Sequence, residues 1–214
     1  MPEKPGTEPD WLLWARQMQS IAQAGLTFCK DPYDLERYTM LRELAAEMLA
    51  RQVEAPVERI SALLRNEEGY ATPKIDIRAA VFDKQGRLLF VRETSDGGRW
   101  TLPGGWADVN LTPAENALKE VREESGYEAR ILKLAAAWDR ARQGHGESLW
   151  SSLKMYFICE LTGGEARPSH ETSGVGWFAR HEIPEDLSTG RVLPHQIARM
   201  FAHYDNPALP TEFE

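Results

Sequence analysis

Three glutamates, Glu120, Glu123 and Glu124, occupy positions i, i+3 and i+4 of a stretch that reads as a helix. Residues at this spacing are neighbours on one helix surface, where like charges repel each other. A hard divalent cation such as Mg²⁺ or Mn²⁺ would remove the repulsion, because these ions prefer carboxylate oxygens. Taken alone, the pattern is more often a solvated acidic face. Two glycines just before the helix, Gly104 and Gly105, let backbone carbonyls approach the same cation and favour a metal site.

The helix that carries these carboxylates has clear signals at both ends. Thr112 suits the N-cap, Pro113 suits the first helical position, and Glu115 completes a capping box with Thr112. Gly126 can take the left-handed conformation that ends a helix. Between these signals runs an apolar stripe that is expected to face a core, and it consists of Ala114, Ala117, Leu118 and Val121.

Loop and helix together resemble the Nudix box, the signature of the Nudix hydrolases, written G-x5-E-x7-R-E-U-x-E-E-x-G-U with U an aliphatic residue. Gly105 opens the box, and Lys119–Gly126 follows in register. The chain departs from the signature at three positions. Leu111 stands where the family has its first Glu, Lys119 replaces the Arg, and Tyr127 replaces the final aliphatic residue.

In the family, that Glu and Arg form a pair that ties the loop to the helix. This chain has lost both members together, which indicates a changed brace rather than a broken one. Glu115 can pair with Lys119 at i, i+4. The glutamates that bind metal in the family are all present, so the departures concern the geometry of the loop more than the chemistry.

The resemblance implies hydrolysis of a pyrophosphate that joins a nucleoside to a variable group, with Mg²⁺ or Mn²⁺ as cofactor. The metal ion would neutralise the phosphate oxygens and lower the pKa of a bound water. Glu120 and Glu124, at i and i+4, are assigned as the principal metal ligands, and Glu123 as a further ligand. A backbone carbonyl at Gly104 or Gly105 is expected to complete the set.

The reaction also needs a general base, and the sequence offers two candidates. In some Nudix enzymes the base is a glutamate of the box, which here would be Glu123. In others it comes from a later loop, and Glu171 lies in such a loop, within P-S-H-E-T-S-G-V-G-W-F. A solvated loop carboxylate is an equally good interpretation of Glu171, since a general base must meet geometric requirements that sequence does not reveal.

Four residues are candidates for binding the substrate. Arg78 lies on a predicted strand, and its planar fork suits a phosphate, although an edge-strand salt bridge explains it nearly as well. Trp100 and Trp106 flank the paired glycines and can stack on a base or simply pack. Asp108 lies in the same G-G-W-A-D loop.

Composition narrows the class of partner. The 214 residues carry a formal net charge of −8, and a chain this acidic is not expected to coat a nucleic acid backbone. Two distant cysteines, Cys29 and Cys159, suggest neither a disulfide framework nor a zinc site, and they favour a reducing cytoplasm. No apolar run approaches the length that spans a membrane, and the first residues lack the apolar segment of a signal peptide.

Periodicity divides the chain into a helical part and a mixed part. Residues 1–66 predict a small all-helical N-terminal domain, with helices over about 10–28, 33–51 and 56–65. Residues 67–73 have the composition of a linker. Residues 74–214 predict the Nudix domain, an α/β or α+β sandwich with a mixed sheet between helices. Its strands are expected at 75–82, 87–93, 129–140, 149–161 and 174–179, and its helices at 113–125 and 194–204.

The helical extension joined to this box looks like the Nudix subgroup related to CDP-choline pyrophosphatase, so a CDP-choline-like substrate is favoured. An ADP-ribose or nucleotide-sugar pyrophosphatase is the alternative. A non-catalytic Nudix-fold nucleotide sensor is a second class, although a sensor has no need to keep three repelling carboxylates. An RNA-processing nuclease shares the same phosphorus chemistry, and the acidic charge argues against it.

The helical domain is expected to make the protein a homodimer and to help shape its site. A segment of this size buries only part of its apolar surface alone. Exposed apolar patches usually mark an interface, and two-fold pairing is the commonest closed solution. The apolar residues in question are Trp11, Trp14, Met18, Leu41, Leu44, Met48, Leu63 and Leu64.

Overall fold

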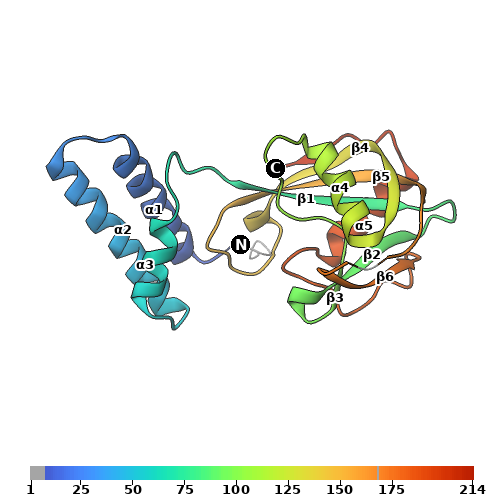
Figure 1. The fold of residues 1–214 in the computed structure, drawn as a ribbon, viewed down its shortest axis with the longest axis horizontal. Coiled ribbons are helices and arrows are strands. Elements are labelled where there is room, and N and C mark those ends of the chain that lie inside the picture. Colours follow the sequence, from blue (N-terminus) through green and yellow to red (C-terminus); the bar gives the residue numbers. More distant parts are fainter. Residues whose placement is uncertain (1–7, 168) are drawn as a thin grey trace, which may run out of the picture. The chain divides into compact units, whose positions relative to one another are not determined.

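The computed structural model describes residues 8–167 and 169–214 and divides the chain into two compact units (Figure 1). The helical unit contains the chain up to Pro73 together with Glu147–Ser151. The sheet unit contains Lys74–Gly146 and Ser152–Glu214. No helix in the described ranges combines the length and the apolar character that crossing a bilayer requires.

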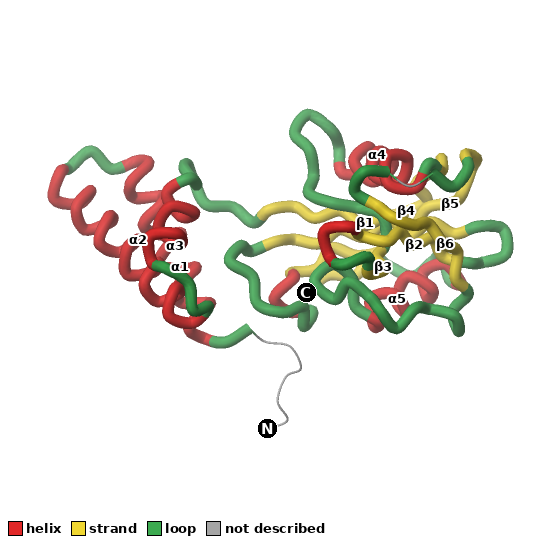
Figure 2. The backbone as a smooth tube through the Cα atoms, turned by 60° about the horizontal axis from the view of Figure 1, so that its bottom comes forward, coloured by secondary structure: helices red, strands yellow, loops and turns green. Residues whose placement is uncertain are grey.

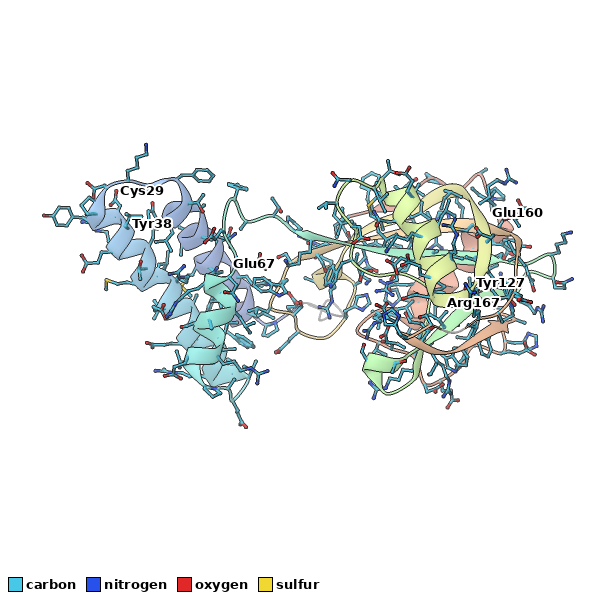
Figure 3. All side chains as sticks on the ribbon, in the orientation of Figure 1. Cys29, Tyr38, Glu67, Tyr127, Glu160 and Arg167 are labelled. Carbon is cyan, nitrogen blue, oxygen red and sulfur yellow. The ribbon has the colours of Figure 1, made fainter. Side chains whose placement is uncertain are left out.

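The described part of the helical unit contains three α-helices: α1 (Asp10–Phe28), α2 (Pro32–Gln52) and α3 (Val57–Arg65) (Figure 2). Asp31 caps α2, since its carboxylate accepts the backbone N–H groups of the next residues and Pro32 follows at the first helical position. The turn of the chain from α1 to α2 brings the Tyr38 ring against Gly25, where any larger side chain would collide (Figure 3). The core of the unit consists of Leu12, Ala15, Ala45, Ala46, Leu49, Ala50, Ile60 and Leu64.

The apolar residues of α1 divide between the core and the surface. Leu12 and Ala15 lie in the core, whereas Trp14 and Ile21 are exposed, with Phe28 65% exposed. The exposed residues Trp14, Ile21 and Phe28 repeat every seven positions, so they form one stripe along α1, which we call the α1 stripe. Leu44 of α2, which the periodicity assigns to the apolar face, is also exposed.

One short segment of the later sequence belongs to the helical unit. Leu149 and Trp150 pack against its core, and Glu147–Ser151 is grouped with it. The strand predicted to begin at Leu149 therefore begins only at Ser152. Leu149 and Trp150, just before β5, pack in the core of the helical unit, and an alternating pattern of apolar residues does not reveal this.

The sheet unit is built on a mixed sheet of seven described strands. Its strands are β1 (Lys74–Phe82), β2 (Leu88–Glu93), β3 (Arg99–Thr101), β4 (Tyr127–Asp139), β5 (Ser152–Gly164), β6 (Thr172–Phe178) and β7 (Glu212–Phe213). The strand order is β3-β2-β1-β5-β4-β7, and β6 also pairs with β2. Strand β1 is parallel to β5 and antiparallel to β2, so the sheet is mixed, as predicted.

Two helices cover opposite faces of this sheet, α4 (Pro113–Ser125) and α5 (Pro194–Asp205) (Figure 2). Alternation along β1 divides its side chains between the two faces. Ile77, Ala79 and Val81 pack with Ala117 and Val121 of α4. The opposite face forms the larger core with α5, and it includes Ala80, Phe82, Phe90, Tyr156, Ile158, Met200 and Phe201. The predicted class, a mixed sheet between helices after a helical region, is confirmed.

Some strand limits differ from the prediction. Gly163 and Gly164, which lie beyond the predicted end of the strand at residue 161, belong to β5 and pair with the start of β4. The short strands β3 and β7 were not predicted at all, because two or three residues carry no readable period. Strand β3 pairs with β2 across a short loop, whereas the partner of β7 on β4 is distant in sequence, so only the folded chain makes β7 a strand.

Candidate active site

Helix α4 begins and ends where the local sequence dictates. The N–H of Glu115 donates to the Thr112 hydroxyl, and the Glu115 carboxylate accepts the N–H of Thr112 at 2.8 Å, so the predicted capping box is formed. Gly126 closes the helix in the left-handed region with φ 76°. These local signals fix which residues of the box face the sheet.

The loop before α4 runs alongside β1. The N–H of Ala79 donates to the Pro103 carbonyl at 2.9 Å, and the N–H of Ile77 donates to the Gly105 carbonyl at 2.8 Å. Gly104, with φ 146°, passes so close to β1 that a Cβ would collide with the Ile77 carbonyl oxygen. Glycine is therefore required at position 104 for both its conformation and its lack of a side chain.

Glu120 and Glu124 are buried next to this loop. The N–H of Gly104 donates to Oε2 of Glu124 at 2.9 Å, and Gly105 lies beside the Glu120 carboxylate. Burial raises the pKa of Glu124 to about 8, and the charge of Glu120 adds to the rise. Burial also raises the pKa of Glu120. Two neighbouring buried carboxylates with raised pKa values favour a cation between them and the loop.

Glu123 lies in a different environment from the other two glutamates. Its carboxylate is exposed and 3.0 Å from the ammonium of Lys119. Among the described residues, no group of three or more His, Cys, Asp or Glu side chains is close enough to hold a metal ion. The structure therefore brings together two of the three predicted carboxylate ligands and leaves Glu123 paired with a lysine.

The two loop glycines differ as well. The Gly105 carbonyl is directed at β1, where it accepts the N–H of Ile77, so the Gly104 carbonyl is the better candidate for a metal ligand. Within residues 8–167 and 169–214, no donor is found for the Gly104 carbonyl. The carboxylates of Glu120 and Glu124 and the carbonyl of Gly104 therefore offer oxygen donors on neighbouring segments, and oxygen donors suit Mg²⁺ or Mn²⁺.

Glu171 lies near the C-terminal end of α4. The hydroxyl of Thr172 donates to the Glu124 carbonyl at 2.6 Å and ties the loop of Glu171 to the helix. An open cleft of about 530 Å³ contains both Glu123 and Glu171 among its lining residues. Arg167 also lines it, at the C-terminal end of α4, where its N–H donates to the Ser125 carbonyl (Figure 3). Both candidate bases therefore face one solvent-filled space.

Arg78 does not have the environment of a phosphate-binding residue. Its guanidinium is buried and donates twice to Asp76, at 2.9 Å each, and once to the Leu102 carbonyl at 3.2 Å. The ammonium of Lys154 donates to the same Asp76 carboxylate at 2.8 Å. Burial opposes the charge of Asp76, but Arg78 and Lys154 outweigh it and hold the pKa of Asp76 at about 2. The expected phosphate contact of Arg78 is thus replaced by a buried ion cluster beneath the loop.

The other three candidate substrate residues have three different environments. Trp100 packs edge-on against Phe178 with ring centroids 5.0 Å apart, and the Arg92 guanidinium covers its face. Trp106 is more than half exposed and keeps a free indole surface. The carboxylate of Asp108 is 3.0 Å from the Lys119 ammonium, so it pairs with the box helix. Trp106 is thus the one of the two tryptophans with a largely exposed ring, and Asp108 is exposed but paired with Lys119.

Sequence reasoning missed two residues that hold the site together. Asn116 is almost fully buried, and its side chain bonds four backbone groups of the preceding loop. Lys154 is buried on β5 beside Asp76. An asparagine four residues after an N-cap was a readable signal for Asn116, since helix interiors disfavour it. Nothing local distinguishes Lys154 from a surface lysine.

Comparison with known proteins establishes the family. A model of the NUDIX domain matches residues 72–196, more than half of the chain. A second model, described as a UDP-X-like N-terminal oligomerisation domain, matches residues 9–64. The chain belongs to the Nudix hydrolases, enzymes that typically depend on divalent metal ions. It is a nucleoside diphosphate-X pyrophosphatase.

Three relatives resemble this chain closely. YjhB of Bacillus subtilis, named for a proposed ADP-ribose pyrophosphatase activity, is 40% identical over 204 residues, which cover 95% of this chain and 97% of YjhB. A crystal structure of a UDP-X diphosphatase is 32% identical with a TM-score of 0.61 and covers 96% of this chain and 98% of its own. An ADP-ribose pyrophosphatase from Streptococcus suis is 32% identical with a TM-score of 0.59, over 67% of this chain and 100% of its own.

Proposed function

We propose that this enzyme hydrolyses the pyrophosphate bond of ADP-ribose, with UDP-linked sugars as the second candidate class. The observation that carries the proposal is the buried pair of Glu120 and Glu124 beside the Gly104 loop. The substrate class is supported by YjhB and the UDP-X diphosphatase, which match this chain along both units. The CDP-choline-like substrate that the sequence favours receives no such support, and it becomes a comparison substrate in the test.

Glu120, Glu124 and the Gly104 carbonyl would hold a divalent ion, Mg²⁺ or Mn²⁺. Such an ion neutralises diphosphate oxygens and lowers the pKa of a bound water when it is present. The protein's own contribution is to keep the two carboxylates of α4 buried and in fixed positions. The N–H of Gly104 orients the Glu124 carboxylate, and the Thr172 hydroxyl holds the last turn of the helix.

Glu171 is the preferred general base. It faces the cleft, and its charge contributes to the raised pKa of Glu120, although burial is the larger cause. Glu123 faces the same cleft, but its carboxylate lies 3.0 Å from the Lys119 ammonium and is already engaged in an ion pair. A base must also come within hydrogen-bond reach of the attacking water, and a loop residue can move to do so.

Trp106 is the proposed contact for the nucleoside base. Its indole is exposed on the loop that carries Gly104, so a stacked base would lie near the carboxylate pair. Asp108 and Arg78, by contrast, are engaged with other side chains. Family membership and the buried carboxylates support hydrolysis rather than nucleotide sensing without catalysis.

A competition assay tests the proposal. Purified enzyme is given equimolar ADP-ribose, UDP-glucose and CDP-choline with Mg²⁺ or Mn²⁺, and the nucleoside monophosphates are separated by chromatography. AMP should form fastest, UMP next, and CMP slowest. Faster release of CMP than of both others would reject the proposed substrate class. No product without added metal ion, and product with it, is the expected metal dependence.

The helical unit is proposed to pair two copies of the chain. The model that matches residues 9–64 describes an oligomerisation domain, and the α1 stripe offers an apolar surface for it. The proposed role of residues 1–66 in shaping the site is tested by removing them. A truncated protein that hydrolysed the same substrate at the full rate would leave the extension no part in recognition.

A further inference from the structure

Two side chains of α4 hold the loop that precedes it. The Asn116 amide accepts the N–H of Asp108 at 2.9 Å and donates to the carbonyls of Asp108, Leu111 and Thr112 at 3.2–3.4 Å. Lys119 lies one turn further along the helix, and its ammonium is 3.0 Å from the Asp108 carboxylate. Backbone and side chain of Asp108 are thus both fixed to the same helix surface.

This arrangement replaces the pair that the Nudix box lacks here. Leu111 stands at the box position of the loop glutamate. Its side chain is partly exposed and cannot accept a hydrogen bond or form an ion pair. The expected substitute, a pair between Glu115 and Lys119, is not what forms, because the Glu115 carboxylate is bound to Thr112. Lys119 instead reaches Asp108, three residues before Leu111.

The held loop is the one that carries Gly104. The N–H of Gly104 donates to Glu124 at 2.9 Å, so a displacement of the loop moves this donor away from a carboxylate of the site. Lys119 also lies 3.0 Å from Glu123 and 4.0 Å from Glu120. A single lysine therefore connects the loop to the charged face of α4.

We propose that Asp108, Asn116 and Lys119 form a clamp that positions Gly104 against Glu124, with Asp108 as the relocated carboxylate of the brace. The three are positioning residues, since none belongs to the proposed donor set of the metal. The inference rests on the proposed function of the Glu120–Glu124 pair. In this interpretation the carboxylate that the box places at position 111 is supplied by Asp108 instead.

The clamp is separable from the stability of the fold. The side chains of Asp108 and Lys119 are 55% and 33% exposed, and exposed ion pairs contribute little to the free energy of unfolding. Asn116 is buried with four hydrogen bonds, so its replacement would disturb folding as well as the loop. Asp108→Asn is therefore the informative variant, because it removes the charge and nearly preserves the shape.

The test compares Asp108→Asn with Glu160→Gln, which breaks an exposed ion pair with Arg130 between β4 and β5. Three quantities are measured: Mn²⁺ affinity of the enzyme by electron paramagnetic resonance, amide exchange of residues 104–112 without metal, and kcat with Mg²⁺. Asp108→Asn should weaken Mn²⁺ binding and lower kcat by roughly 10- to 100-fold, the range for residues that orient metal ligands. Its loop amides should exchange faster, while the melting temperature matches that of Glu160→Gln.

A rescue variant sharpens the test. Leu111→Glu with Lys119→Arg, added to Asp108→Asn, restores the family's pair and should recover at least half of the lost Mn²⁺ affinity. The clamp is overturned if Asp108→Asn equals Glu160→Gln in Mn²⁺ affinity and loop exchange, or if the triple variant recovers nothing. If the wild type hydrolysed none of the three substrates, the proposed function would fail, whereas Mn²⁺ affinity and loop exchange would still decide the clamp.

Discussion

At the scale of the residue, burial separates the three box glutamates into two roles. Glu120 and Glu124 lie in a dry environment that raises the pKa of each, and Glu123 lies in water beside Lys119. A carboxylate buried without a cation is unfavourable, and a metal ion held by Glu120 and Glu124, as proposed above, would offset this cost. The identical side chain thus serves different purposes one residue apart.

Glu124→Gln and Glu120→Gln should each lower kcat by roughly 10²- to 10⁴-fold, because a metal ion supplies several kcal/mol of charge stabilisation and each 1.4 kcal/mol is tenfold. Glutamine keeps the shape and can still accept the Gly104 N–H, so the fold should persist. Steady-state kinetics with Mg²⁺ measures the effect, and circular dichroism checks the fold. Near-normal turnover in both variants would reject the assignment of these ligands.

Glu171→Gln should reduce kcat by roughly 10²- to 10⁴-fold with little change in KM, since general base catalysis acts in the transition state. Glu123→Gln is the matched comparison, because both carboxylates line one cleft. If turnover depends on Glu123 and not on Glu171, the base lies in the box. A pH–rate profile that loses its acidic limb in only one variant would identify the base directly.

The buried ion cluster makes a prediction about acid stability. The pKa of Asp76 is about 2 in the folded state and 3.8 in the unfolded reference, so its charge contributes about 2 kcal/mol that is present above pH 4 and lost as pH falls towards 2. Asp76→Asn leaves Arg78 and Lys154 buried without their counter-charge and should cost about 3–5 kcal/mol at pH 7.

Urea unfolding of the two proteins from pH 7 to pH 3 measures this difference. The gap in the free energy of unfolding should narrow below pH 4, because there the unfolded wild type takes up a proton at Asp76 while the folded wild type, with a pKa of about 2, does not. A gap that stays constant to pH 3 would mean that Asp76 has the same pKa in the folded and unfolded states, and that Arg78 and Lys154 do not lower it.

At the scale of the element, α4 joins the chemistry to the sheet. Its inner face packs Ala117 and Val121 on β1, and its first turn is locked by the capping box. The residues that clamp the loop, Asn116 and Lys119, follow directly after this first turn. Fraying of the N-terminus of α4 would therefore release the loop as well as destabilise the helix.

Thr112→Ala should lower the free energy of unfolding by about 1 kcal/mol, the usual effect of losing an N-cap oxygen. It should also lower kcat, because fraying of the first turn of α4 would loosen the hold of Asn116 and Lys119 on the loop. Thr112→Ser keeps the hydroxyl acceptor and should behave as the wild type in both measurements. An alanine variant with normal stability and normal kcat would show that the cap has no influence on the site.

At the scale of the whole molecule, the exposed α1 stripe is the predicted interface of a homodimer. Replacing Trp14 and Phe28 by glutamate places charges on the exposed face of α1 without touching the core of the helical unit. Light scattering should give the wild type about twice the single-chain mass of 24.2 kDa and the double variant 24.2 kDa. Tyr70→Glu, an exposed aromatic residue outside the helices, is the control that keeps the larger mass.

A wild-type mass of 24.2 kDa would refute the dimer. A dimer that survives the double substitution would place the interface on another surface, such as the exposed residues Tyr33, Met40 and Leu44 of α2.

Much of the fold could be predicted from local sequence signals. The limits of α4 follow from Thr112, Pro113 and Gly126, and its structure begins and ends at the predicted residues. The alternation in β1 and the amphipathic helices of the first 66 residues were likewise readable. Such features depend on neighbours along the chain, which is why hydrophobic period and capping residues predict them.

The geometry of the site was decided by contacts between residues that are distant in sequence. The sequence allowed Arg78 to be read as a phosphate-binding residue. Parallel pairing of β1 with β5 instead places Lys154 beside Asp76, and with Arg78 they form a buried ion cluster. The Gly105 carbonyl accepts a hydrogen bond from β1. The Lys119 ammonium pairs with Asp108 and Glu123 rather than with Glu115. The sequence by itself therefore determined the family, the box helix and its carboxylates. Only the tertiary structure decided which oxygens and charges meet, because those distances depend on how separate segments pack.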